Sequence, residues 1–198
     1  MFLSEPDITP ARRDLYDDDL HHDGYVANAT RGWAWLPESR ASLYALMVEA
    51  SRAGNLSYRD AGILVTATAS RLGDSYCSLA WGNRLASSAD PGTALAVLRG
   101  ELSEEMTPRE AAMADWARQL VTDPNATTQQ DVDRLRQVGL SDAEIFATTV
   151  YVALRIAFST VNDGIGARPD SELVAEAPSE LVAAIDFGRT PEPIPSQM

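Results

Sequence analysis

The spacing of hydrophobic positions predicts helices along most of the chain. Between Pro37 and Gly54, for example, Leu43, Met47 and Ala50 recur at intervals that place their side chains on one face of a helix. No segment bounded by turn signals alternates between hydrophobic and polar positions as a half-buried strand does. The pattern therefore predicts an all-α fold, a single domain of seven or eight helices. The other expected helices begin at or near Ser57, Asp74, Pro91, Thr107, Thr128, Asp142 and Ser179.

Several of these helix starts carry a capping box. In this motif a serine or threonine and an acidic side chain one turn later accept hydrogen bonds from each other's backbone N–H groups. The expected pairs are Ser57 with Asp60, Thr107 with Glu110, and Ser141 with Glu144. These pairs define where the helices begin more sharply than the hydrophobic spacing does.

The longest expected helix runs from about Asp142 to Asn162 and is apolar around most of its surface. A helix that is apolar all round is normally buried. We therefore expect this helix at the centre of the fold, packed against the helix over residues 75–88.

The two ends of the chain are expected to differ from the helical domain, which we assign to residues 37–188. Residues 1–36 lack clear periodicity and are expected to wrap the surface as loops and a short helix. Residues 189–198, "RTPEPIPSQM", are rich in proline and are expected to form a mobile tail.

Composition narrows the range of partners and compartments. With 16 basic and 29 acidic residues the formal net charge is −13, which argues against nucleic acid and anionic membranes as partners. No apolar run approaches the roughly 18–20 residues of a membrane span, and the N-terminus has no apolar signal core. A single cysteine excludes an intramolecular disulfide. We expect a soluble, cytoplasmic protein.

Acidic residues crowd the segment before residue 24. Asp14, Asp17, Asp18, Asp19 and Asp23 lie there. Such a run is typical of a solvated acidic face. A metal site that also uses the adjacent His21 and His22 is the alternative, but neighbouring side chains point in different directions and rarely share one metal. We expect no metal and no cofactor, because the chain has no Gly-rich phosphate loop and no paired Cys/His ligand spacing.

The stretch "GDSYCSLAWG" (73–82) holds the only cysteine, Cys77, in the first turn of an expected helix. The helix dipole favours a thiolate there. Asp74 acts the other way, since as N-cap its carboxylate lies close to the thiol and disfavours a second anion. We therefore expect an ordinary or raised pKa for Cys77. Three roles stay open for this thiol: a small buried hydrophobic group, single-cysteine redox chemistry with external thiols, or reaction with another small electrophile.

The segment "LSYRDAGILVTATASRLGDSYCSLAWGNRLA" (56–86) resembles the core motif of the AhpD-like, carboxymuconolactone decarboxylase superfamily, in its peroxidase-related branch. Residues 24–38 and 107–170 resemble the preceding and following segments of the family in the same order, so the resemblance spans about residues 20–170. It implies an AhpD-like multi-helix bundle, a small-molecule substrate and a homo-oligomer.

The chemistry of that family is alkyl hydroperoxide reduction by two cysteines, with a Glu–His pair that moves the proton. Carried over by position, the second cysteine is Cys77, the first falls on Asp74, the histidine on Trp81 and the glutamate on Gly62. Tyr76 keeps the tyrosine of the motif. The resemblance thus predicts a fold whose two-cysteine relay is lost.

The candidate catalytic residues are Cys77 and Asp74, although Asp74 has a helix cap as its alternative role. Tyr76 and Trp81 are candidates for substrate binding. We add His21 and His22, because they are the only imidazoles available for proton chemistry near neutral pH. The predicted function is a peroxidase-related oxidoreductase or a divergent enzyme that acts on a small organic substrate. The alternative is a non-catalytic small-molecule-binding or assembly protein with the same fold.

Overall fold

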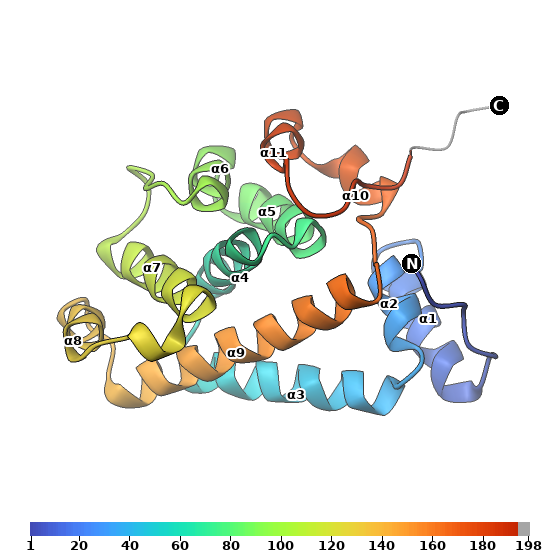
Figure 1. The fold of residues 1–198 in the computed structure, drawn as a ribbon, viewed down its shortest axis with the longest axis horizontal. Helices are drawn as coiled ribbons and strands as arrows, with labels where there is room; N and C mark the ends of the chain where they lie inside the picture. The colour runs from blue at the N-terminus through green and yellow to red at the C-terminus, as the bar shows by residue number, and fades with distance from the viewer. Residues whose placement is uncertain (194–198) are drawn as a thin grey trace.

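A computed structural model describes residues 1–193 of the 198-residue chain, and within this range the chain is helical with no strand, so the all-α prediction is confirmed. Eleven α-helices and one 3₁₀ helix are present in the described part (Figure 1). They are α1 (Pro10–His22), α2 (Asn28–Trp33), α3 (Pro37–Ala53), α4 (Tyr58–Leu72), α5 (Ser75–Ser88), α6 (Pro91–Arg99), α7 (Pro108–Thr122), η1 (Pro124–Ala126), α8 (Gln129–Gln137), α9 (Asp142–Gly164), α10 (Ser171–Glu176) and α11 (Ser179–Ala184).

The helix-capping residues predicted from the sequence make the expected hydrogen bonds at the helix starts. Both hydrogen bonds of the capping box are present at the starts of α4, α7 and α9, and α8 has a fourth box formed by Thr128 and Asp131. Asp74 is the N-cap of α5, and its side chain accepts a hydrogen bond from the backbone N–H of Cys77. Gly73 ends α4 in the left-handed conformation that glycine adopts without strain.

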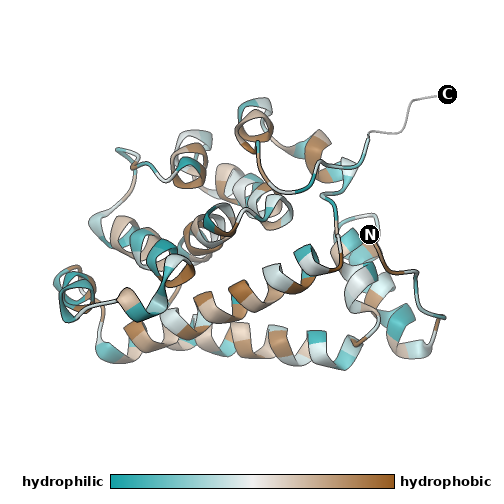
Figure 2. Cartoon of the chain, in the orientation of Figure 1, coloured by the Kyte–Doolittle hydropathy of each residue, from teal (hydrophilic) through white to brown (hydrophobic). Residues whose placement is uncertain are grey.

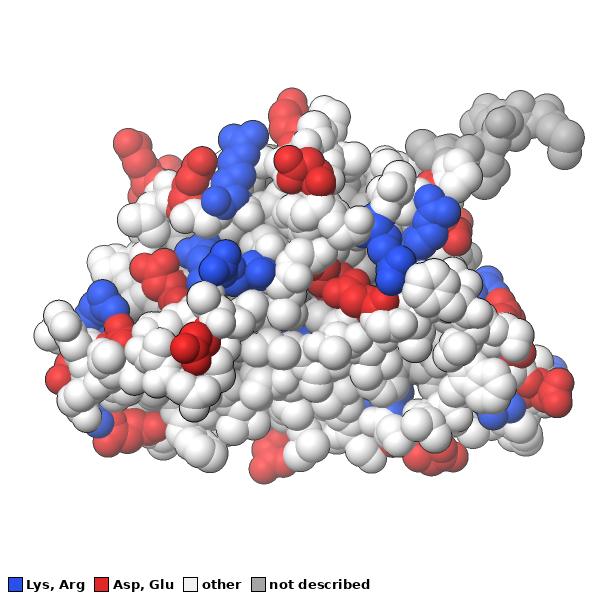
Figure 3. Space-filling view, in the orientation of Figure 1, with Lys and Arg blue, Asp and Glu red and all other residues white. Residues whose placement is uncertain are grey.

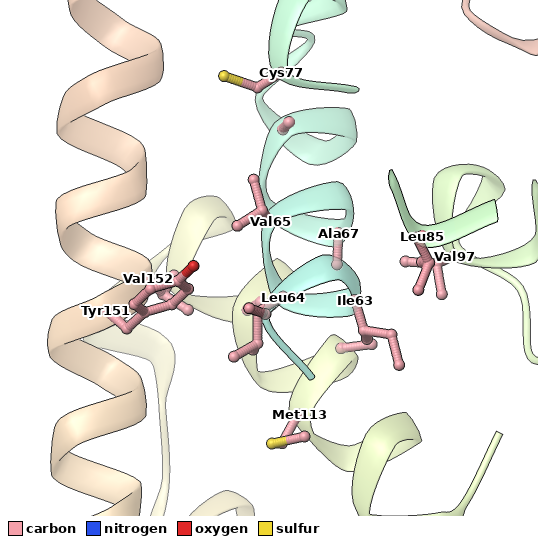
Figure 4. Close-up of a cluster of buried hydrophobic side chains, with 14 of the residues drawn as sticks. Ile63, Leu64, Val65, Ala67, Cys77, Leu85, Val97, Met113, Tyr151 and Val152 are labelled. Carbon is pink, nitrogen blue, oxygen red and sulfur yellow. The ribbon is translucent and has the colours of Figure 1, made fainter. Parts of the chain in front are cut away.

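The central helix is α4, not α9, so the predicted arrangement is wrong on this point. Every residue of α4 from Asp60 to Ala69 is buried, and α4 contacts α5, α6, α7 and α9. Figure 4 shows side chains of α4 pointing toward α9 on one side and toward Leu85 and Val97 on another. Small residues make this close packing possible, since a Cβ at Gly62 would lie only 3.2 Å from the side chain of Leu85.

Helix α9 buries one face against α3 and α4 and leaves the other face uncovered. Phe146 on the uncovered face is 72% exposed, and hydrophobic residues recur along the whole helix (Figure 2). Within the described residues α9 is long and apolar enough to cross a membrane, with a mean hydropathy of 1.3, which corrects the expectation that no run comes close. A helix of a protein core meets the same criterion, and one face of α9 is packed against α3 and α4.

The N-terminal segment contains more helix than its hydrophobic pattern predicts. Helix α1 buries only Asp19, so it has no apolar stripe by which to be recognised. Its start signal is nevertheless present, because the side chain of Thr9 accepts a hydrogen bond from the Arg12 backbone N–H and Pro10 occupies the first turn. Helices α2 and α10 are short and were likewise not predicted.

The start of the C-terminal tail makes hydrogen bonds with the helical domain. The Arg189 carbonyl accepts a hydrogen bond from Ser75 Oγ at 2.8 Å, and the Arg168 guanidinium donates to the carbonyls of Thr190 and Pro191. The remaining tail residues, 194–198, lie outside the described part.

Candidate functional site

A cavity of about 520 Å³ opens beside the first turns of α5, between α3, α9, α10 and the end of α1. Six aromatic side chains line it: Tyr25, Tyr44, Tyr58, Tyr76, Trp81 and Phe158. The lining also contains one thiol, Cys77, and three arginines, Arg40, Arg84 and Arg155. The lining also includes the carboxylates of Asp19, Asp23 and Glu176, so aromatic and charged side chains share the wall. A concave cavity of this size is typical of a small-molecule site.

Cys77 lies at the floor of this cavity and is 2% exposed. Its sulfur points from the start of α5 toward α9 (Figure 4). Burial and, to a lesser extent, the nearby Asp74 carboxylate raise the pKa of the Cys77 thiol to about 12, while Arg155 opposes the rise. The pKa shift has the expected direction, but burial contributes more to it than Asp74 does.

Arg155 is a buried cation beside the thiol. It comes from the buried face of α9, is 4% exposed, and places Nη2 at 3.9 Å from Cys77 Sγ and Nη1 at 3.7 Å from Met47 Sδ. Its guanidinium carbon lies 5.1 Å from the centre of the Trp81 ring and 5.2 Å from that of Phe158. The cation is thus held between two aromatic rings and two weak sulfur acceptors.

Tyr76 lines the cavity with its ring but uses its hydroxyl elsewhere. The Tyr76 O–H donates a hydrogen bond to Asp170 Oδ2 at 2.5 Å, and Asp170 Oδ1 accepts from the Asn28 backbone N–H at 2.9 Å. Burial raises the pKa of the Asp170 carboxyl to about 6, against the lowering effect of these hydrogen bonds. Tyr76 therefore holds α5 to the segment before α10, and its ring is the part available to a ligand.

Trp81 forms part of the cavity wall. The guanidinium of Arg84 lies over the same ring as Arg155, with its carbon at 5.2 Å from the ring centre. The Tyr58 ring is 6.1 Å from it. Because an indole donates one hydrogen bond but does not exchange protons, Trp81 can hold a ligand by contact but cannot replace an imidazole in a relay.

Asp74 and Gly62 are not among the residues that line the cavity. Asp74 is fully buried and its Oδ1 accepts the Cys77 N–H at 3.0 Å, while Oδ2 has no hydrogen-bond partner. Gly62 packs against Leu85 on the far side of α4. The positions thus serve the helix cap and the helix contact.

Only one of the two candidate histidines lies at the cavity. His22 lines the mouth of the cavity, where its Nδ1 lies 3.3 Å from a carboxylate oxygen of Asp18, whereas His21 is not among the lining residues. Asp19 in the same acidic run is buried rather than solvated, since its carboxylate accepts the Ala27 backbone N–H and faces Arg40 at 3.8 Å.

Among the described residues no group of three metal-ligating side chains is close enough to hold a metal.

Arg155 and Asp170 were not predicted from the sequence as site residues. They lie 78 and 94 residues from the α5 side chains that they meet. For Arg155 a signal was available, because it is a lone charge in the apolar stretch "IFATTVYVALRIAF" (145–158). A buried charge without a neighbouring counter-charge is often functional.

The cap and the thiol can be separated by mutation. In Asp74→Asn the side-chain oxygen still caps α5, but the negative charge is gone, so the pKa of Cys77 should fall. Alkylation by iodoacetamide at pH 7 should then be faster, by roughly tenfold for each unit by which the pKa drops. Asp74→Ala, the matched control, should instead lose the cap and about 1 kcal/mol of unfolding free energy. An unchanged or slower alkylation rate in Asp74→Asn would rule out this effect of the carboxylate.

Solved structures of other proteins share this arrangement of helices. An uncharacterized peroxidase-related protein from Ralstonia eutropha JMP134, described as an alkylhydroperoxidase AhpD core, matches with a TM-score of 0.75 and 20% identity over 87% of this chain and 93% of that chain. An uncharacterized peroxidase-related protein from Silicibacter sp. TM1040 matches with a TM-score of 0.74 and 18% identity over the same shares.

The debrominase Bmp8 matches with a TM-score of 0.71 and 12% identity over 89% of this chain and 92% of that chain, and a variant of Bmp8 with a cysteine replaced by alanine has been solved in complex with 2,3,4-tribromopyrrole. No protein-family model and no curated protein matches the sequence. The structural matches cover nearly the whole of each partner, and the chain therefore has the AhpD-like fold.

Proposed function

We propose that this protein is a single-cysteine thiol oxidoreductase that acts on a small organic substrate in the cavity beside α5. The observation that carries the proposal is the position of Cys77, whose sulfur lines an aromatic cavity of about 520 Å³ next to a buried cation. The AhpD-like fold supports it, since proteins described as peroxidase-related share this fold. The Bmp8 complex adds that a protein of this fold can hold a small aromatic ring.

The proposed cycle needs one protein thiol and an external thiol. With an organic hydroperoxide, the Cys77 sulfur attacks the terminal peroxide oxygen, the O–O bond breaks, and the substrate leaves as an alcohol while Cys77 becomes a sulfenic acid. One external thiol converts the sulfenic acid to a mixed disulfide and releases water. A second external thiol reduces the mixed disulfide and leaves as part of a small disulfide.

Without a second cysteine, this cycle depends on external thiols, and it is slow at neutral pH. With a single cysteine in the chain, no second thiol can resolve the sulfenic acid within one chain. Trp81 cannot accept the thiol proton, so another group near the thiol, the substrate or water takes it. Because the thiolate is the nucleophile, a pKa of about 12 for Cys77 makes the reaction slow at neutral pH.

A non-catalytic binding protein is the second candidate, and two observations favour it. Burial keeps the pKa of Cys77 high, and Trp81, which lines the cavity beside it, cannot transfer protons. Comparison of the wild type with Cys77→Ser distinguishes the two candidates, because a binding protein would retain its ligand affinity and show no turnover in either form.

We also propose that the chain forms a homo-oligomer through the uncovered faces of α3 and α9. The exposed hydrophobic side chains on these two helices include Leu46, Val48, Phe146 and Val161. Figure 3 shows a broad uncharged area over this part of the molecule. Large exposed apolar areas are typical of contact surfaces between proteins.

The oligomer can be tested with one substitution. Light scattering at micromolar concentration should give at least twice the 21.4 kDa mass of one chain. Phe146→Glu should lower that mass, because a carboxylate in an apolar contact is left without a partner, and Leu102→Glu in an exposed loop is the matched control. A wild-type mass equal to that of one chain would exclude the oligomer.

A soluble, cytoplasmic location is consistent with this proposal. The cycle requires a free cysteine and external thiols, which a reducing compartment supplies. The acidic net charge of −13 is likewise compatible with a protein that does not bind anionic membranes.

A further inference from the structure

We infer that the cavity is an organic-anion site: it binds a small carboxylate with a flat apolar body, and Arg155 anchors the carboxylate. The inference names the ligand class of the proposed function and rests on its premise that this cavity is the substrate site. It is carried by one observation: the buried guanidinium of Arg155 lines the cavity and has no oxygen partner among residues 1–193.

The hydrogen-bonding state of Arg155 is unusual for its burial. Within the described residues its hydrogen-bond partners are two sulfur atoms, Met47 Sδ and Cys77 Sγ, and its Nε, like that of Arg118, has none. Other arginines in shielded positions have oxygen partners: Arg118 donates to Asp115 and to the Val97 carbonyl, and Arg40 faces Asp19. A buried charge without a counter-charge is strongly unfavourable. A ligand anion would supply the missing partner.

The surroundings of Arg155 favour a planar acceptor with two oxygens. Its guanidinium carbon lies near the Trp81 and Phe158 rings, at 5.1 and 5.2 Å from their centres. Guanidinium groups stack on aromatic faces while their N–H edge remains free for donation, and that edge matches a carboxylate in two parallel hydrogen bonds. Trp81 and Phe158 both line the cavity, so they are also placed to contact the ligand body.

The remaining lining restricts the rest of the ligand. Four tyrosines line the cavity, which favours an apolar, flat body over an inorganic anion. Asp19, Asp23 and Glu176 also line it, and Asp19 is paired with Arg40. These carboxylates disfavour a second negative charge on the ligand. With a net charge of −13 the chain also repels anions at long range, so binding must come from local contacts.

A competing role for Arg155 is to stabilise a Cys77 thiolate without contacting any ligand. Its Nη2 lies 3.9 Å from Sγ, and it lowers the pKa of Cys77 against the stronger effect of burial. This role predicts that Arg155 substitutions slow thiol alkylation but leave ligand affinity unchanged. The anion-site role predicts the loss of a preference for charged ligands.

The decisive experiment measures binding of matched pairs of acid and amide by calorimetry and ligand-observed NMR. The probes are benzoate against benzamide, and indole-3-acetate against indole-3-acetamide, at low ionic strength and pH 7. At least one carboxylate should bind the wild type at least about tenfold more tightly than its amide, as expected when a charged hydrogen bond replaces a neutral one. Binding of neither acid, or equal binding of acid and amide, would overturn the inference without any variant.

Variants then assign the preference to a residue. Arg155→Gln should bind acid and amide equally, Arg155→Lys should keep part of the preference, and Arg118→Gln, which removes an arginine far from the cavity, should keep all of it. Circular dichroism checks that each variant is folded. A preference that survives in folded Arg155→Gln would contradict the assignment.

The same titration in Cys77→Ser separates this inference from the proposed function. If the serine variant and the wild type bind the carboxylate equally but the wild type shows no turnover, the anion site stands and the thiol chemistry fails. If the wild type turns over neutral substrates and shows no preference for acids, the thiol chemistry stands and the anion site fails.

Discussion

Cys77→Ser should reduce the turnover of an organic hydroperoxide with an external monothiol to the uncatalysed rate, a loss of roughly a thousandfold or more, as is usual when a catalytic nucleophile is removed. Serine is nearly isosteric but far less nucleophilic, and it forms no sulfenic acid. The measurement is steady-state formation of the alcohol, with cumene hydroperoxide as substrate. Because Cys77 is the only cysteine, no other thiol of the chain can compensate.

The pH dependence of the turnover rate is a second test of the role of Cys77. Burial raises the pKa of Cys77 to about 12, so between pH 7 and 9 the thiolate fraction, and with it the turnover rate, should rise by about tenfold per pH unit. A dithiol should give no advantage over a monothiol at equal thiol concentration. Turnover that persists in Cys77→Ser, or a rate that is flat over this range, would contradict a mechanism based on this thiol.

Leu64→Ala should lower the free energy of unfolding by about 2–5 kcal/mol, the usual range for a leucine removed from a rigid core. Leu64 is fully buried in α4, which contacts four other helices. The matched control is Leu102→Ala, the same chemical change at a side chain that is 68% exposed, which should change the stability by less than about 0.5 kcal/mol. Urea unfolding of both variants gives the comparison.

Equal effects of the two substitutions would mean that α4 is not the centre of the core. A large effect of Leu64→Ala with unchanged helical content in the folded state would support the packing described above. It would also show that the cavity beside α5 is built on a rigid support, since α5 packs against α4.

Local signals in the sequence were sufficient to predict most helices. Each capping box, such as Ser57 with Asp60, satisfies the first turn with residues of the same segment, so no tertiary information is needed. A short helix was expected within residues 1–36, but α1 could not be located there because its residues have little hydrophobic periodicity. Tertiary contacts such as the hydrogen bond from Arg12 Nε to the Ala34 carbonyl hold it in place. The central position of α4 was also missed, since periodicity does not say which of two apolar helices the others surround.

The site was predictable only where it is local in the sequence. Cys77, Tyr76 and Trp81 lie on consecutive turns of α5 and all face the cavity. The cap by Asp74 follows from the same turn, whereas its burial away from the cavity required the fold. Arg155 reaches Cys77 only because α9 returns to the start of α5, and Asp170 meets Tyr76 in the same way.

The most direct test of the central claim, that Cys77 reacts with a small organic substrate in this cavity, is the intact mass of the protein after exposure to cumene hydroperoxide without a reductant. We predict a gain equal to one oxygen atom, located on Cys77 by trapping with dimedone and reversed by an external monothiol. Preincubation with a carboxylate that binds at Arg155 should slow the gain. A chain that keeps its original mass while the hydroperoxide is consumed, or that gains oxygen only on methionine, would contradict the account.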